Sequence, residues 1–448
     1  MGRNLSLNFG LILISAGLLI GSSTSQANVI IHEKESVKFY AGGYAALDLF
    51  ADTTQGIEEI VGSTPVARPG TIAGDTGRTV VSSRTSRFAL GMITNRGSLT
   101  TKGHIEADFM GYQPGVGNGV SEAGYYQNPT LRLRHAYFLA EENGWSILAG
   151  QYWSLFGWQM DYISRTVSLP PMTGNLFART PQLTIMKKLV NGDDDSVTFA
   201  VSVSRPSERD SEVPNLDGGI KIGLGGRKAS YAYSNTPVRT FETSLAITGT
   251  LRQVAHPTKT ASGYDTARKK VSAIAVDFIL PLIAMGTEND LGNTLVLAGE
   301  YTAGSGYGDH FPRWTGNILN PNGSLPEGET IQQPFIDSGL AGLASSDGSI
   351  QSVKLKTWNL NMQYHLPSMI GGWVTLGAAE LASPNAKDLK ASGTAVVYNR
   401  QRGAYLNIVH NFTAELRVGA EYALMQTRYV DDVQAQNHRV QLTTWYIF

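Results

Sequence analysis

Alternation of apolar and polar residues is the feature that most constrains the fold of this chain. In the segment 438–448, Val440, Leu442 and Tyr446 alternate with Arg439 and Gln441. A period of two residues is typical of a β-strand that has one face in an apolar environment. The same period recurs in residues 273–280, 358–364 and 415–424. The chain is therefore predicted to be rich in strands.

The environment of these strands separates two fold classes. A soluble β-sandwich would also alternate, because one face of each sheet packs on the core. Here the polar face carries charged and small residues over segments of about 9–13 residues, and aromatic residues lie near the ends of the apolar face, as in a barrel with a polar lumen and aromatic girdles. No run of about 18 apolar residues follows residue 27, which excludes helical spans, so only a closed barrel could cross a bilayer.

Short and long connections alternate along the chain. We predict short turns at 95–98, 142–144, 191–195, near Pro237, and at 283–291, 367–371 and 411–413. We predict long loops at 51–82, 113–129, 154–181, 207–216, 257–267, 305–352, 382–392 and 427–436. Together they give an all-β transmembrane antiparallel β-barrel of about 16 strands with short periplasmic turns and long extracellular loops. The region 217–250 is the least defined, which keeps 14 and 18 strands as alternatives.

The N-terminus has the pattern of a secretory signal peptide. Arg3 precedes an apolar run from Leu5 to Ile20, and the small residues Ser25 and Ala27 follow it. We therefore expect residues 1–27 to be a cleaved signal peptide and residues 28–448 to be the barrel, with a retained membrane anchor as the alternative. The chain has no cysteine, so no disulfide can stabilise it. Its formal net charge of -1 gives no sign of the basic surface that binds nucleic acid.

Four stretches carry a resemblance to a known family. They are Arg87-Phe88-Ala89-Leu90-Gly91, Glu106-Ala107-Asp108-Phe109, Leu131-Arg132-Leu133-Arg134-His135-Ala136-Tyr137 and Ala149-Gly150-Gln151-Tyr152-Trp153-Ser154-Leu155-Phe156. They resemble the DcaP-like porins, a family of trimeric outer-membrane channels of Gram-negative bacteria. The resemblance implies a homotrimer and small anionic solutes such as dicarboxylates as cargo. Many members carry a periplasmic helical segment before the barrel, whereas here about ten residues separate the signal peptide from a first strand expected at Val37.

The C-terminus carries a second resemblance. Tyr446-Ile447-Phe448 is similar to the signal by which outer-membrane proteins present their last strand to the barrel assembly machinery. It implies that Phe448 is a contact to that machinery and that outer-membrane lipid surrounds the folded barrel.

Strand parity directs a set of charged side chains into the lumen. The cations are Arg87, Lys102, Arg132, Arg134, Arg417 and Arg439, and the carboxylates beside them are Glu106 and Asp108. A turn centred between Arg96 and Gly97 would place Arg87 directly opposite Glu106. One interpretation is a basic wall that attracts anionic solutes, since an arginine fork binds carboxylates bidentately. The other is a set of cross-strand ion pairs that stabilise the wall.

The third long loop, residues 154–181, is a candidate constriction loop. It occupies the position that folds inward in sixteen-stranded porins, and Asp161 within it would face the arginine wall and create a transverse field. The alternative is an external loop that packs against a neighbouring subunit. The prolines at 170 and 171 favour a rigid loop in either case.

Two other functions compete with a passive channel. An outer-membrane barrel enzyme, lipase-like, could assemble its site from several strands, but no local catalytic motif is present; parity places His135 on the lipid face, and His410 lies near a turn. A plugged structural or adhesin barrel would have a lumen filled by large side chains. The small inward Ala89, Gly91, Ala273, Ala275 and Gly419 favour an open lumen. We therefore expect passive diffusion of small polar, anionic solutes, without catalysis, cofactor or metal.

Overall fold

The computed structural model describes most of the chain after residue 27. The described residues are 28–34, 36–59, 61–111, 127, 129–167, 173–191, 195–206, 212–260, 263–287, 290–320 and 339–448. The expected signal peptide, residues 1–27, lies outside the described residues. In the part of the chain that the structure describes, no helix is long and apolar enough to cross a membrane.

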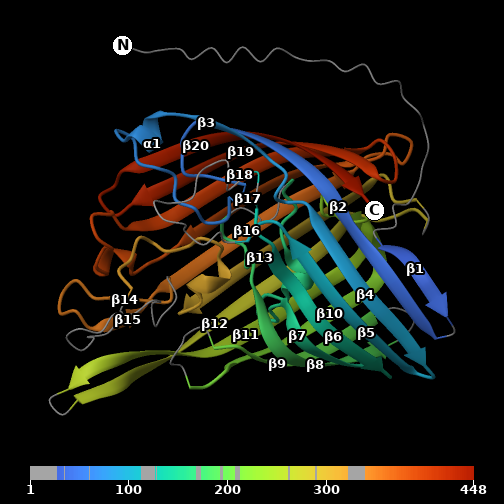
Figure 1. Ribbon diagram of the computed structural model, residues 1–448, viewed down its shortest axis with the longest axis horizontal. Coiled ribbons are helices and arrows are strands. Elements are labelled where there is room, and N and C mark those ends of the chain that lie inside the picture. The colour runs from blue at the N-terminus through green and yellow to red at the C-terminus, as the bar shows by residue number, and fades with distance from the viewer. Residues whose placement is uncertain are drawn as a thin grey trace.

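Sixteen antiparallel strands close into one barrel, which confirms the expected strand number (Figure 1). In order around the barrel they are β2 (Val37–Asp52), β4 (Arg87–Arg96), β5 (Leu99–Asp108), β6 (Arg132–Glu142), β7 (Trp145–Trp153), β8 (Arg179–Asn191), β9 (Asp195–Ser204), β10 (Asn215–Tyr231), β11 (Arg239–Thr260), β12 (Gly263–Ile283), β13 (Thr294–Ser305), β16 (Lys354–His365), β17 (Trp373–Ala382), β18 (Tyr398–Asn411), β19 (Leu416–Tyr429) and β20 (Gln434–Ile447).

Strand β2 closes the barrel by pairing with both ends of the sheet. Its first half pairs with β4, and the stretch from Tyr44 to Asp52 pairs with β20. Two further strands, β1 (Asn28–Lys34) and β3 (Arg78–Ser82), pair with the remaining edges of β2. The sheet thus has no long unpaired edge, as a chain surrounded by lipid requires. The sequence did not predict β1, because the first strand was expected only at Val37.

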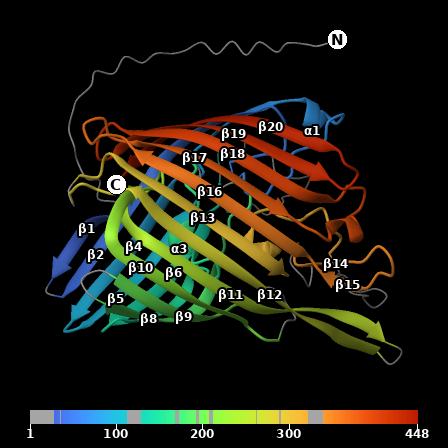
Figure 2. The ribbon, with the colours of Figure 1, turned by 180° about the vertical axis from the view of Figure 1, so that it is seen from behind.

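The two ends of the barrel differ in their connections. We call the end with the seven short turns and the C-terminus the turn end, and the opposite end the loop end (Figures 1 and 2). The loop-end connections hold the short elements α1 (Ile72–Asp75), α3 (Gln159–Tyr162), η1 (Gly308–His310), β14 (Ala341–Leu343), β15 (Ile350–Ser352) and η2 (Ala386–Asp388). One predicted loop was wrong: residues 257–267 lie mostly in β11 and β12, which remain paired as far as Thr260 and Gly263 and project beyond the loop end.

Alternation along the strands separates an apolar outer face from a polar inner one. On β16, Leu360 and Met362 are exposed on the outside, whereas Asn359, Asn361 and Gln363 between them are buried inside. The outer face therefore suits hydrocarbon, and the inner face offers hydrogen-bonding groups to segments or solutes inside the barrel.

Loop-end segments fill a large part of the interior. Ile57, Phe156, Leu176, Trp314 and Leu389 come from four different connections and share one buried apolar cluster. Elsewhere in the interior, small inward residues make room for large rings instead of leaving open space, contrary to the expectation from sequence. A Cβ atom on Gly91 would collide with the ring of Tyr40, and one on Gly419 would lie 2.8 Å from Trp445. The inner surface is therefore built around large rings.

Candidate pore-lining site

The charged wall on β4, β5 and β6 begins with a register that differs from the expected one. Arg87 pairs with Asp108, and Arg96 pairs with Leu99, so the turn is centred between Gly97 and Ser98. The predicted position of Arg87 directly opposite Glu106 was therefore wrong by two residues. The guanidinium group nevertheless reaches Glu106 diagonally, with 3.6 Å between Nη1 and Oε1. Diagonal neighbours on a sheet lie within reach of such a long side chain.

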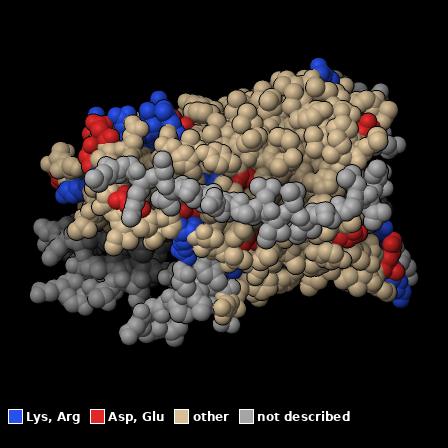
Figure 3. All heavy atoms as spheres, turned by 90° about the horizontal axis from the view of Figure 1, so that it is seen from above, with Lys and Arg blue, Asp and Glu red and all other residues tan. Residues whose placement is uncertain are grey.

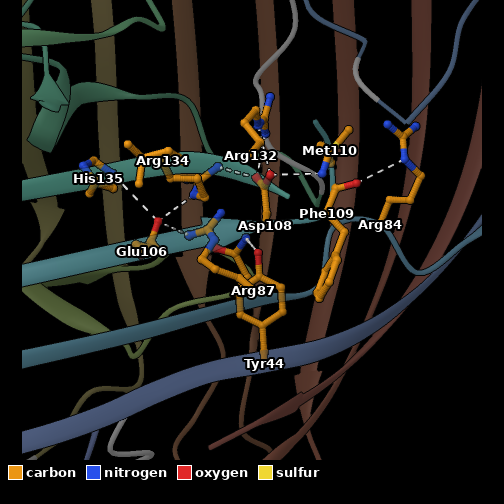
Figure 4. A network of polar contacts seen from close by, with 12 residues as sticks. Tyr44, Arg84, Arg87, Glu106, Asp108, Phe109, Met110, Arg132, Arg134 and His135 are labelled. Carbon is orange, nitrogen blue, oxygen red and sulfur yellow. Dashed lines mark hydrogen bonds and ion pairs between the residues drawn. The ribbon is translucent and has the colours of Figure 1, made fainter. Parts of the chain in front are cut away.

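The arginines of β6 complete a network with the carboxylates of β5 (Figure 4). Arg134 donates from Nε to Glu106 at 2.6 Å and from Nη1 to Asp108 at 3.1 Å. Arg132 binds both oxygens of Asp108, at 2.9 and 2.6 Å. Two carboxylates are thus shared by three arginines, so the network carries a surplus of positive charge.

A β-bulge at Arg134 explains why parity failed beyond this point. His135 pairs with Glu106 and Leu133 pairs with Ala107, so Arg134 has no partner of its own in the ladder. One extra residue reverses the faces of all residues that follow it. His135 was expected on the lipid face, but it is buried inside with its Nε2 3.8 Å from Glu106. Tyr137, two residues further along the strand, likewise packs inside, against Tyr152.

Next to this network lies a cavity of about 250 Å³. The wall contributes Arg87, Lys102, Glu106 and Arg134 to its lining, and the start of β11 contributes Arg239. Among the residues that the structure describes, neither Lys102 nor Arg239 forms an ion pair. Lys102 instead lies over the rings of two tyrosines, 5.7 and 5.9 Å from their centroids. The cavity thus has four cations and a single carboxylate in its lining.

Two of the cations at this site were not candidates from the sequence. Arg179, at the start of β8, lies 5.1 Å from the ring centroid of Trp153 and is close enough to Arg132 and Arg134 to interact with them electrostatically. It had been assigned to the third long loop. Arg239 falls in the region that was least defined. It lies two residues after Pro237, at the end of a predicted turn, where parity assigned no face.

The third long loop enters the barrel. Gly157 donates its amide hydrogen to Thr248 on β11, Tyr162 donates to Ser244 on the same strand, and Val167 donates its amide hydrogen to Glu421 on β19. These strands lie on different sides of the lumen, so the loop crosses the interior. The described parts of this loop thus lie inside the barrel, and constriction of the solute path by the loop stays a prediction.

Asp161 does not face the arginine wall. It forms an ion pair with Lys221 on β10, four strands along the sheet from β6. The cation of this loop that is most enclosed is Arg165, whose guanidinium carbon lies 3.8 Å from the ring centroid of Tyr231 and 3.5 Å from that of Tyr233. Aromatic stacking of this kind holds a guanidinium group without an acid partner.

The connection between β10 and β11, residues 232–238, also folds inward at the turn end. The Asn235 amide group donates to the hydroxyl of Tyr44, and Ser234 donates to the carbonyl of Thr166. Arg417 holds this segment: its Nη1 donates to the carbonyls of Ser234 and Thr236 at 2.7 and 2.8 Å. Arg417 lies inside the barrel as expected, but its hydrogen bonds are made to the protein itself.

Arg439 is engaged in a similar way. It donates to both oxygens of Asp52, at 2.9 and 2.7 Å, and to the carbonyl of Glu58 at 2.7 Å. Asn437 donates to the same carboxylate at 2.8 Å, and the Arg439 and Asp52 side chains are each only 1% exposed. This pair joins β20 to β2 and to the connection that follows β2.

Within the described ranges, no group of three or more His, Asp or Glu side chains is arranged to hold a metal ion.

The fold defines the class of structure: a sixteen-stranded barrel with an in-folded loop is the architecture of outer-membrane porins. No protein-family model matches the chain, and no curated protein matches it in sequence. Solved structures do match it over nearly its whole length, and they are porins and other outer-membrane proteins.

Three solved structures illustrate the likeness. The outer-membrane channel DcaP of Acinetobacter baumannii is 17% identical, with a TM-score of 0.62 over 93% of this chain and 99% of that one. An anion-selective porin from Comamonas acidovorans is 11% identical, with a TM-score of 0.51 over 92% and 100%. The trimer form of OmpT, an outer-membrane protein of Vibrio cholerae, is 9% identical, with a TM-score of 0.50 over 92% and 100%. The likeness to DcaP agrees, at the level of fold, with the resemblance seen in residues 84–156.

Proposed function

We propose that this protein is an outer-membrane porin through which small anionic solutes diffuse passively along the arginine wall of β4–β6. The observation that carries the proposal is the charge of that wall and its cavity. Six cations, Arg87, Lys102, Arg132, Arg134, Arg179 and Arg239, lie there with two carboxylates, Glu106 and Asp108. A lumen wall with a surplus of fixed positive charge concentrates anions and repels cations.

The proposed solute path lies between this wall and the segments that fold inward. The cavity is lined on its other side by the loop residue Ile163 and by the turn residues Tyr233, Asn235, Thr236 and Pro237. A solute carboxylate there would meet Lys102 and Arg239 without first displacing a protein acid. We place solute contact at these two residues and at Arg87 and Arg134, because the hydrogen bonds of Arg417 and Arg439 are made to the protein.

Location and assembly follow from the same proposal. We infer that residues 1–27 are removed on export, that the turn end faces the periplasm, and that Phe448 guides assembly of the barrel in the outer membrane. A homotrimer is proposed from the trimer form of the Vibrio protein, and preference for anions is in line with the anion-selective Comamonas porin. Dicarboxylates are the proposed cargo, since two carboxylates could meet two cations of the cavity. The proposed mechanism involves no catalytic step.

Single-channel recording in planar bilayers tests the proposal. The wild-type barrel is expected to conduct in steps grouped in threes, with a reversal potential in a salt gradient that favours anions. The variant K102Q/R239Q removes the two cavity cations that form no ion pair with described residues. Its anion-to-cation permeability ratio is expected to fall by about threefold or more, because a lumen charge acts at close range on each passing ion.

A matched control separates lumen charge from total charge. Lys187 and Arg227 lie at the turn end, where Lys187 packs over Trp145 and Arg227 donates to the carbonyl of Leu282. The variant K187Q/R227Q loses the same charge as K102Q/R239Q, and its permeability ratio should stay near the wild-type value. Equal ratios in all three proteins would contradict the arginine wall as the selectivity element.

One observation favours the second candidate, a structural barrel whose lumen is plugged: part of the interior is filled by packed side chains. The apolar cluster that includes Phe156 and Trp314 fills part of the loop end. A trimer that forms normally but never conducts would support the plugged barrel, and assays of lipid hydrolysis on that sample would then test the enzymatic alternative.

A further inference from the structure

A row of basic side chains lies on the outside of the barrel at the loop end. It begins with Lys354 and Lys356 on β16, continues with Arg400 and Arg402 on β18, and ends with Arg428 on β19. We call these five residues the outer basic patch. Alternation places them outside, because Leu355, Thr357 and Gln401 between them are buried inside the barrel.

The register makes the patch continuous. Lys356 pairs with Ala382 on β17, Ala382 pairs with Arg400, and Arg400 pairs with Arg428. Residues paired across antiparallel strands have Cβ atoms about 4.5–5.5 Å apart. The cations of three different strands therefore lie side by side on one face, near enough to bind one extended anionic group together.

The patch has fewer acids than bases. Glu380 on β17 binds Arg402 at 2.5 Å and lies 3.8 Å from Arg400, and Asp432 binds Arg428 at 2.6 Å. Within the described residues, Lys354 and Lys356 form no ion pair. Arg402 and Arg428 keep 54% and 44% of their side chains exposed, so their remaining donors face outward.

The level of the patch matches the headgroups of a lipid layer. The next outward residue of β16 after Lys356 is Trp358, which pairs with Tyr301 on β13, and both are exposed. Closer to the turn end the outer surface is apolar, with Leu360, Leu376 and Leu406 exposed. Aromatic girdles mark the boundary between hydrocarbon and headgroups in outer-membrane barrels. In Figure 3, Lys and Arg lie together with Asp and Glu at the loop end of the wall, and a broad, mostly uncharged surface separates them from the charged groups at the turn end.

We propose that the outer basic patch binds the phosphate groups of a phosphorylated glycolipid in the outer leaflet. The proposal rests on the outer-membrane location proposed above, but not on conduction. The acyl chains would lie on the apolar band, and the phosphates would meet the row of Lys and Arg, whose donors match phosphate oxygens. Below the aromatic level the outer wall offers no comparable set of cations on these strands, so the binding would also fix which leaflet the loop end faces.

The test is lipid retention by purified barrels. Native mass spectrometry would count the lipopolysaccharide molecules bound to wild type, to K356Q/R402Q and to K187Q/R227Q, which loses one lysine and one arginine at the opposite rim. Each basic residue near an anionic lipid surface is worth about 1 kcal/mol, so lipopolysaccharide affinity should fall about tenfold or more in K356Q/R402Q. It should stay close to the wild-type value in K187Q/R227Q.

Two further measurements keep the proposal falsifiable. The charge-preserving variant K356R/R402K should retain wild-type affinity, which distinguishes loss of charge from a folding defect. Dephosphorylated lipopolysaccharide should bind wild type and K356Q/R402Q equally. Equal affinity of K356Q/R402Q and wild type for the intact lipid would overturn the proposal, and so would a tenfold difference that persists without phosphates. Because conduction is recorded separately, a barrel without conductance would leave this result intact.

Discussion

Two groups of inward arginines in the same barrel are bound in opposite ways. On β4–β6, Arg87, Arg132 and Arg134 share two carboxylates and border a cavity. On β19 and β20, Arg417 and Arg439 are almost fully buried and donate to main-chain carbonyls or to one dedicated acid. Strand parity placed all five inside, yet only the first group keeps a surplus of charge next to open space.

The difference shows what an inward arginine can do. An arginine that donates to main-chain carbonyls or to an acid of its own stabilises the connection it binds, whereas one that shares its acids with other arginines still presents positive charge to a solute. Each group therefore makes a distinct prediction: loss of an arginine at β19–β20 should reduce stability, and loss at β4–β6 should alter selectivity.

The largest effect on stability is expected at Arg439. Replacement by alanine leaves the Asp52 carboxylate buried with Asn437 as its remaining side-chain donor. Breaking a buried pair by removing one partner costs about 3–5 kcal/mol. The free energy of unfolding, measured by urea titration of the refolded barrel in lipid vesicles, should fall by that amount.

The Asp52→Asn change provides the control for Arg439. In D52N/R439A the buried charge is absent, so most of the lost free energy of unfolding should return. A double variant as unstable as R439A alone would mean that packing of Arg439 on Phe50, at 4.7 Å, matters more than its charge.

The next largest effect is expected at Arg417. Alanine there leaves the carbonyls of Ser234 and Thr236 without this donor, at a cost of about 2–3 kcal/mol. The segment 232–238 should then loosen at the turn end, and the open-channel current should become noisier. Gln363 also binds this segment, because it accepts from the amide of Ala232 and donates to its carbonyl. Unchanged stability combined with unchanged current noise would show that Tyr44 and Gln363 suffice to hold the segment.

Much of the fold could be predicted from the sequence because its signals are local. Alternation in residues 358–364 and 415–424, together with the rhythm of short and long connections, was enough for sixteen strands. The register of the strands could not be predicted in the same way. Centring the first turn one residue too early placed Arg87 opposite Glu106 instead of Asp108. A period of two carries no information about where a hairpin turns.

The site was harder to predict because it depends on one extra residue and on long-range contacts. The bulge at Arg134 has no signature in Leu133-Arg134-His135, yet it turns His135 and Tyr137 inward. The partner of Asp161 is Lys221, sixty positions away, and no local pattern could identify it. The arginines themselves were identified correctly as inward residues; which of them face a cavity depends on connections that fold inside the barrel.

At the arginine wall, the expected loss of stability is smaller. In R134Q, Glu106 keeps a contact with Arg87 and Asp108 keeps Arg132, so the free energy of unfolding should fall by about 1–2 kcal/mol, well below the value for R439A. The anion-to-cation permeability ratio of R134Q should also be lower than that of wild type. A loss as large as that of R439A would place Arg134 among the structural arginines and weaken its role in selectivity.

The smallest effect is expected at Gly419, and it tests whether the interior at β19 is as tightly packed as its arginines suggest. An added Cβ would lie 2.8 Å from Trp445 and 3.3 Å from Val167 of the in-folded loop, so Gly419→Ala should cost about 1 kcal/mol by overpacking. Gly103 on β5 is the reference position: it lies between the cavity residues Lys102 and His104 and so faces outward, where an added Cβ has no neighbour within 4 Å. Gly103→Ala should leave the free energy of unfolding unchanged or raise it slightly, since alanine restricts the unfolded chain more than glycine does. If both changes cost the same, the interior at β19 would be no more tightly packed than an unobstructed position on the outer face, and the packed β19–β20 side would fail where it is simplest to measure, at a single methyl group.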